Sequence, residues 1–223
     1  MNKSSVLLIL VFLMPLLSNA QIRAVTEKGD SIYVYSDGTW SFELEDIRED
    51  VMADFLEEVL DIDTITQVQS YPKSVDKTLE TGINQFEFKY NSKQWKRVPP
   101  AEFNDDAEFA FELRNHDVMA IIITEETEIG TENILKIARS SLEENLGGTV
   151  EVMKIEQRNV NGTELLRGVF LAEVSGIEFL FDSYYYSDER GTTQLTVWTG
   201  LSLWEKYESK IVDFLNGMIV KSE

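Results

Sequence analysis

The chain has 223 residues, of which 43% are hydrophobic and 27% are charged, and its net charge at pH 7 is −20. These proportions are typical of a globular protein with one principal domain. The acidic excess makes nucleic acids and anionic lipid surfaces poor partners, because like charges repel. The chain has no cysteine and one histidine, which excludes a disulfide framework and the usual ligand sets of zinc.

The first twenty residues have the pattern of a secretory signal peptide. Lys3 supplies a positive start, residues 6–17 are almost wholly apolar, and small residues precede Gln21. We therefore predict cleavage between Ala20 and Gln21, which leaves a soluble periplasmic or secreted protein with no membrane span. A retained membrane anchor is the alternative, although the apolar run is shorter than the roughly 20 residues that a spanning helix needs.

The segments that follow differ in their periodicity. Residues 21–44 hold three short runs of alternating apolar and polar residues between glycine-containing turns, which predicts a small β ribbon. Residues 45–61 place apolar side chains at helical spacing, with acidic residues on the other face, which predicts an acidic amphipathic helix. Such an acidic face is typical of a solvated helix and lacks the glycine-bearing loop of a calcium site. Residues 62–84 are polar and hold few apolar anchors, so we interpret them as a linker.

Residues 85–223 carry the clearest patterns and are predicted to form the main domain. A strand and a hairpin are predicted before a helix over residues 132–146. Turn signals then divide residues 150–199 into four strands, and the first signal, Asn161-Gly162, is the pair favoured in a two-residue hairpin. A capping box of Ser202 and Glu205 predicts a closing helix over residues 203–219.

The strand that contains Tyr184, Tyr185 and Tyr186 is apolar on both faces. Alternate residues of a strand point to opposite faces, so Tyr184 and Tyr186 share one side and Tyr185 takes the other. A sheet that is apolar on both faces needs a cover on each, and the two predicted helices can supply it. We therefore expect these rings to pack in the core, with tyrosine hydroxyls at its rim. A ligand platform formed by Tyr184, Tyr186 and Trp198 is the alternative.

The order of these elements resembles a known superfamily. The stretches QWKRVPP, FAFELRNHDVMAIII and LTVWTGLSLWEKYESKIVDFLNGM, with the long meander before the last of them, look like the PsbP-like superfamily. This superfamily also holds the Mog-type Ran-binding factors and exported bacterial domains, and the resemblance covers about residues 85–220. It implies an α+β fold, an α/β/α sandwich in which helices cover both faces of a mainly antiparallel sheet, and a non-enzymatic binding or accessory role. Ran binding and photosystem attachment are not transferred, because no residues diagnostic of either are found in the chain.

The residues that could perform catalysis do not form a recognised set. His116 is predicted to be exposed in a polar turn, and the chain has no G-x-S-x-G motif for a serine nucleophile. Two pairs of adjacent carboxylates exist, at 105–106 and 125–126, but no spacing places two of them across a cleft. We therefore predict no catalytic residue, no metal and no cofactor.

Two functions remain open. The first is an exported, non-enzymatic binding or accessory protein that engages an unidentified protein partner in the cell envelope. The second is a carbohydrate-active or other hydrolase that uses paired carboxylates beside Tyr184, Tyr186 and Trp198. The first predicts aromatic rings packed beneath helices, whereas the second predicts an open cleft in which two acids have separated pKa values.

Overall fold

The computed structural model describes residues 59–83, 85–146 and 148–221, together with the backbone of three short strands closer to the N-terminus. These strands are β1 (Ile22–Val25), β2 (Ser31–Val34) and β3 (Trp40–Ser41), which form one small sheet in the order β1-β2-β3. They fall within the range for which the sequence predicts a β ribbon. The predicted signal peptide and residues 45–58 of the predicted acidic helix lie outside the described residues.

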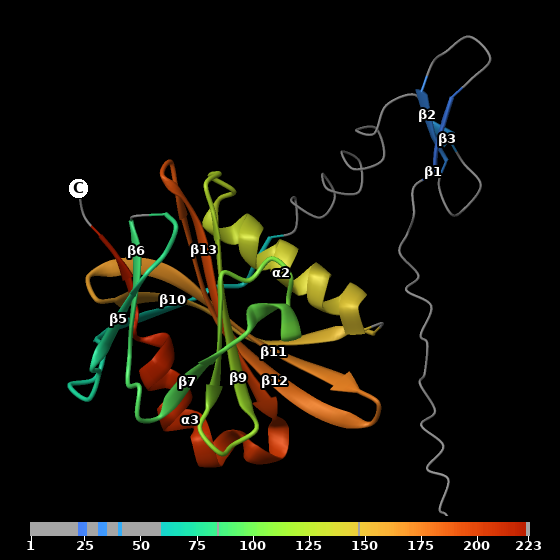
Figure 1. The fold of residues 1–223 in the computed structure, drawn as a ribbon. Coiled ribbons are helices and arrows are strands. Elements are labelled where there is room, and N and C mark those ends of the chain that lie inside the picture. Colours follow the sequence, from blue (N-terminus) through green and yellow to red (C-terminus); the bar gives the residue numbers. More distant parts are fainter. Residues whose placement is uncertain are drawn as a thin grey trace, which may run out of the picture. The chain divides into compact units, whose positions relative to one another are not determined.

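The chain divides into two compact units, residues 1–57 and 58–223. An eight-stranded mixed sheet forms the centre of the second unit, in the order β4-β10-β11-β12-β13-β9-β8-β7 (Figure 1). Its strands are β4 (Asp63–Gln69), β7 (Trp95–Val98), β8 (Phe109–Leu113), β9 (Val118–Glu125), β10 (Val150–Val160), β11 (Thr163–Val174), β12 (Ile177–Asp188) and β13 (Gly191–Gly200). All neighbouring pairs are antiparallel except β4 and β10, which run parallel.

Three further strands and three helical segments complete this unit. A second sheet has the order β14-β6-β5. The remaining elements are β5 (Lys77–Glu80), β6 (Phe86–Tyr90), β14 (Met218–Val220), the short 3-10 helix η1 (Pro100–Glu102), and the helices α2 (Thr131–Leu146) and α3 (Leu201–Leu215). The chain therefore has the α+β class that the sequence predicts. Among the described helices, none has the length and apolar character needed to cross a membrane.

Tight turns build the long β10–β13 meander. Asn161 and Gly162 have φ angles of 54° and 92°, and Ser175 and Gly176 have φ angles of 53° and 82°. Positive φ at both central residues defines a type I′ turn, whose twist suits antiparallel strands and whose first position asparagine tolerates. The predicted hairpin at Asn161-Gly162 is thus confirmed, and the four strands predicted over residues 150–199 are β10 to β13.

Each helix packs with a different tyrosine of β12. Tyr185 lies in a cluster with Leu135 of α2, and Tyr184 lies in a second cluster with Ile211 of α3. Gly168 of β11 lets α2 approach closely, because a Cβ at this position would meet Leu135 Cδ1 at 3.3 Å and the Phe170 ring at 2.8 Å. Burial of these apolar side chains is the main stabilising contribution to such a fold.

Two boundaries differ from those that the sequence predicts. Residues 62–84 are not a linker, because they contain β4 at one edge of the large sheet and β5 in the small one. Both strands are largely exposed, so their side chains lack the apolar alternation by which half-buried strands are recognised. The closing helix begins at Leu201 after Gly200, so the predicted cap Ser202 lies inside it and does not cap it. It ends at Leu215 and not at 219, since Met218 belongs to β14 and pairs with Phe88.

Candidate functional site

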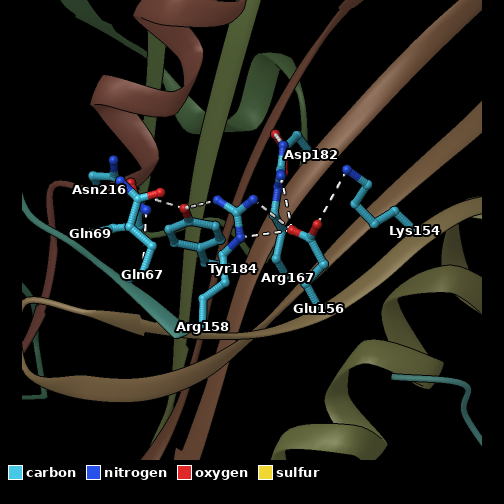
Figure 2. Close-up of polar contacts among 9 residues, drawn as sticks. All are labelled: Gln67, Gln69, Lys154, Glu156, Arg158, Arg167, Asp182, Tyr184 and Asn216. Carbon is cyan, nitrogen blue, oxygen red and sulfur yellow. Dashed lines mark hydrogen bonds and ion pairs between the residues drawn. The ribbon is translucent and has the colours of Figure 1, made fainter. Parts of the chain in front are cut away.

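Tyr184 lies in a buried polar network that spans β10, β11 and β12 (Figure 2). Its hydroxyl donates to Asn216 Oδ1 at 2.9 Å, and Arg158 Nη1 lies 3.5 Å from the same oxygen. Arg167 stands opposite Tyr184 in the register, and Glu156 stands opposite Arg167. Residues opposite each other in antiparallel strands share a face, so the fold gathers these polar groups on one side of the sheet.

Arg167 and Asp182 form a buried ion pair. Arg167 Nε donates to Asp182 Oδ1 at 2.7 Å, and Nη2 donates to Oδ2 at 2.6 Å. Asp182 is 0% exposed and Arg167 is 6% exposed. Burial raises the pKa of Asp182 despite the opposing effect of Arg167, whereas the bonds to Asp182 outweigh burial and raise the pKa of Arg167. A raised pKa favours the neutral form of Asp182 and the charged form of Arg167. We take the pair to be ionised, because both carboxylate oxygens accept hydrogen bonds from the guanidinium group.

Glu156 contacts Arg167 of this ion pair and two further cations. Its Oε2 accepts bonds from Arg158 at 2.7 Å and from Arg167 at 3.1 Å, and its Oε1 lies 3.2 Å from Lys154 Nζ. Burial acts to raise the pKa of Glu156, but Arg158, Arg167 and Lys154 together lower it. The two carboxylates therefore neutralise the two arginines within the protein.

Tyr186 belongs to a separate cluster at the end of β12. Its hydroxyl donates to Asp188 Oδ2 at 3.0 Å, and Arg190 Nη2 donates to the same oxygen at 2.7 Å. Burial acts to raise the pKa of Asp188, but the hydrogen bonds from Arg190 and Tyr186 lower it. Tyr186 is half-buried, and its ring meets the edge of Phe86 with centroids 6.2 Å apart.

Trp198 points to the face opposite Tyr184 and Tyr186. It pairs with Phe181 across β12 and β13, and the two rings stack with centroids 6.2 Å apart. Phe103, which is 37% exposed, meets Trp198 edge-on at 5.7 Å. Phe181 and Tyr186 are five positions apart along β12, which corresponds to a distance of about 17 Å. The three residues that the sequence proposed as one platform therefore occupy a buried network, a rim cluster and an aromatic cluster.

The two pairs of adjacent carboxylates lie at separate places in the fold. Glu125 stands opposite Thr192, six residues along β13 from Trp198, which is about 20 Å. Asp105 and Asp106 are exposed in the turn after η1. A depression of about 270 Å³ in the described part has a lining that contains none of the three candidate residues: Thr149, Val150, Glu151, Leu171, Ala172, Glu173 and Glu178.

The sequence prediction missed the ion pairs and the partial burial of His116. Arg167 and Asp182 each interrupt an apolar strand, in LLRGVF and FLFDSYYY. A charge inside an apolar strand signals a buried partner, because an unpaired buried charge is strongly unfavourable. His116 lies in the predicted turn, but it is half-buried, and its Nδ1 lies 2.9 Å from the hydroxyl of Tyr207.

No family model and no curated protein sequence matches the chain, whereas several solved structures share its fold. Cyanobacterial PsbP (CyanoP) from Synechocystis is 13% identical, with a TM-score of 0.52 over 67% of this chain and 95% of that one. The Ran-binding protein Mog1p of Saccharomyces cerevisiae is 9% identical, with a TM-score of 0.45 over 66% and 96%. LpqN, involved in cell envelope biogenesis of Mycobacterium tuberculosis, is 10% identical, with a TM-score of 0.45 over 66% and 90%. The likeness to CyanoP shows that the two proteins share a fold.

Proposed function

We propose that this protein is an exported, non-enzymatic binding or accessory protein that engages a protein partner in the cell envelope. The signal-peptide pattern of residues 1–20 supports export. The observation that carries the non-enzymatic part is the mutual neutralisation of the buried charges, in which Arg167 bridges Asp182 and Glu156. Catalytic carboxylates need a substrate-facing position, and these two face arginines inside the protein.

We assign contact with the partner to the aromatic cluster of Trp198, Phe181 and Phe103. Aromatic side chains are enriched where proteins meet, and rings held on a rigid sheet lose little conformational entropy on binding. Phe103 is 37% exposed and Trp198 is partly exposed, so this cluster offers apolar surface to a partner. Tyr186 has a rim position from which it supplies a polar contact, whereas Tyr184 supports the sheet from within.

We also propose that the domain is an α/β/α sandwich with one helix on each face of the sheet. The separate clusters of Tyr184 with α3 and of Tyr185 with α2 support this arrangement. The hydrolase alternative has less support, because the depression of about 270 Å³ is lined by none of the aromatic candidates.

Affinity capture tests the proposed function. The mature chain, residues 21–223, is tagged and used as bait in an envelope extract of its own source, and each recovered protein is purified and tested for direct binding. We expect one envelope protein to bind the purified bait, and the full chain of residues 1–223, when expressed in its own source, to be exported with Gln21 as its first residue by mass spectrometry. Retention of residues 1–20 in the mature protein contradicts export, and release of sugar from envelope polysaccharide by the purified chain contradicts the non-enzymatic assignment.

A further inference from the structure

The chain contains two Asn-Gly dipeptides, Asn161-Gly162 and Asn216-Gly217, and the fold brings them into direct contact. The first forms the turn between β10 and β11, and the second connects α3 to β14. Asn161 Nδ2 donates to the backbone oxygen of Asn216 at 2.8 Å and to that of Met218 at 2.7 Å. One side-chain amide thus holds a segment that lies 55 residues away in the sequence.

Asn161 also holds the segment that follows β4. Its Oδ1 accepts a bond from the backbone N–H of Tyr71 at 3.0 Å, and its own N–H donates to Gln69 O at 2.9 Å. We name the bonds of Asn161 to Gln69, Tyr71, Asn216 and Met218 the Asn161 clasp. The clasp joins the end of β4, the β10–β11 turn and the α3–β14 connection. Its three side-chain bonds depend on an amide, which is both a donor and an acceptor.

Asn-Gly is also the dipeptide in which asparagine loses its amide most readily, because glycine has no side chain to hinder the attack. The Gly162 nitrogen attacks Cγ of Asn161, a C–N bond forms, and the Cγ–Nδ2 bond breaks. Ammonia leaves with the proton of the Gly162 N–H, and a cyclic succinimide remains. Water then opens the ring at either carbonyl to give aspartate or isoaspartate. The reaction requires only water.

The fold restrains both reacting groups, one through Asn159 and the other through the clasp. The Gly162 N–H donates to Asn159 Oδ1 at 3.2 Å, so this bond must break before the nitrogen can lose its proton and attack. Asn161 Nδ2 is bound to two carbonyl oxygens, and rotating Cγ towards Gly162 breaks the bonds to Asn216, Met218 and Tyr71. Deamidation of the folded chain therefore requires local opening of the clasp.

Deamidation also prevents the clasp from closing again. A carboxylate at position 161 has no N–H to donate, and it faces the carbonyl oxygens of Asn216 and Met218, which repel it. Isoaspartate additionally lengthens the backbone of a turn that allows only two residues. Asn216 Oδ1 accepts a hydrogen bond from the Tyr184 hydroxyl at 2.9 Å. Displacement of Asn216 therefore also disturbs the buried polar network around Tyr184. Asn216 itself is only 5% exposed and is better protected.

We propose that Asn161 is a deamidation site that the clasp protects in the folded protein, and that its modification irreversibly releases the α3–β14 connection. This inference is independent of the identity of any partner. It assigns the Asn-Gly turn a second role, because the turn geometry alone requires none of the bonds to Tyr71, Asn216 or Met218.

Peptide mapping by mass spectrometry measures the protection. The mature chain is incubated at about pH 8 while folded and while unfolded in urea, and deamidation at Asn161 is followed over time. We expect the reaction to be at least about tenfold slower in the folded chain, because it proceeds through local opening. Equal rates in the two states overturn the proposed protection, and a stable Asn161 in urea overturns the modification site.

Two variants weaken the protection without changing Asn161. In Gly217→Ala, the added Cβ overlaps the backbone oxygen of Lys89 and displaces the α3–β14 connection. In Asn159→Ala, the Gly162 N–H loses its acceptor, and the four clasp bonds of Asn161 keep their partners. Both are expected to deamidate faster at Asn161 than the wild type. If Gly217→Ala does not fold, Asn159→Ala still provides the test. A wild-type rate of deamidation in Asn159→Ala overturns the protective role of the bond between Gly162 and Asn159.

Hydrogen exchange of Asn161→Asp measures the consequence of modification. We expect faster exchange in the β14 amides, with the amides of α2 unchanged, because the clasp holds the C-terminal segment and the end of β4 and makes no bond to α2. The matched control is Asn145→Asp, which makes the same charge change at an exposed asparagine of α2. Wild-type exchange in β14 of Asn161→Asp overturns the release.

Discussion

Tyr184 contributes to the protein through its hydroxyl as well as its ring. The ring is 0% exposed, so the sequence-based expectation of core packing describes it correctly. Its bonds to Asn216 and Arg158 could not be predicted, because Asn216 is distant in the sequence and lies outside any strand. Tyr184 therefore links the charged network of the sheet to the C-terminal segment.

Tyr184→Phe is expected to lower the free energy of unfolding by about 1–3 kcal/mol, because buried Asn216 Oδ1 loses its donor. Tyr186→Phe is the matched control. Its hydroxyl lies at a half-buried rim and Asp188 keeps its bonds from Arg190, so we expect a loss below about 1 kcal/mol. Urea unfolding measures both variants, and a Tyr184→Phe that is as stable as the wild type contradicts the assigned role.

Arg167→Met is expected to lower the free energy of unfolding by about 3–5 kcal/mol, because it leaves Asp182 charged and buried without its partner. Adding Asp182→Leu to Arg167→Met removes the unpaired buried charge, so the double variant is expected to be more stable than Arg167→Met alone. Urea unfolding of the two single variants and the double variant gives the coupling energy. A double variant whose loss equals the sum of the single losses contradicts an ion pair.

Glu156 is expected to make the folded protein sensitive to acid. Its pKa is lower in the folded protein than the usual value of 4.5, so the unfolded chain binds the proton first as the pH falls. The stability that Glu156 contributes is therefore complete above the pKa of the unfolded chain and is lost as the pH falls through the folded pKa. Glu156→Gln is expected to flatten the dependence of the unfolding free energy on pH below about pH 5. An unchanged slope contradicts this assignment.

At the scale of elements, the long periodic segments could be predicted and the short edge strands could not. The patterns of α2, α3 and the strands β8 to β13 follow from burial on defined faces. β4 has one neighbour in the sheet, and its side chains are mostly exposed, so nothing in DTITQVQ distinguishes it from a polar linker. β14 was predicted as the end of a helix because Met218 continued the apolar stripe of α3.

Leu135 of α2 gives the sharpest test at this scale. It is 0% exposed and its side chain packs over Gly168 of β11. Leu135→Ala therefore leaves a cavity that the rigid sheet cannot fill. We expect a loss of about 2–5 kcal/mol in the free energy of unfolding. Leu142→Ala on the same helix is the control, since Leu142 is half-buried and its loss is expected to be smaller. Equal losses contradict the packing described for α2.

At the scale of the whole molecule, the fold alone does not assign an activity. The chain shares its fold with CyanoP at only 13% sequence identity, and one fold can carry different surface residues and therefore different functions. The sequence predicted the fold class and the rings of the core, because both follow from apolar periodicity. It combined Tyr184, Tyr186 and Trp198 into one site, because strand alternation assigns faces only within one strand, whereas the register between β12 and β13 places Trp198 on the other face.

The binding of the captured envelope partner to defined variants tests the central claim most directly. Isotherms are measured for the wild type, for Trp198→Ala and for Ile177→Ala, an exposed residue at the far end of β12 that is 57% exposed. Unfolding curves confirm that each variant is folded. We predict that Trp198→Ala weakens binding at least about tenfold, as expected for a central aromatic contact, and that Ile177→Ala binds like the wild type. Wild-type affinity in a folded Trp198→Ala contradicts the assignment of the aromatic cluster as the contact with a protein partner.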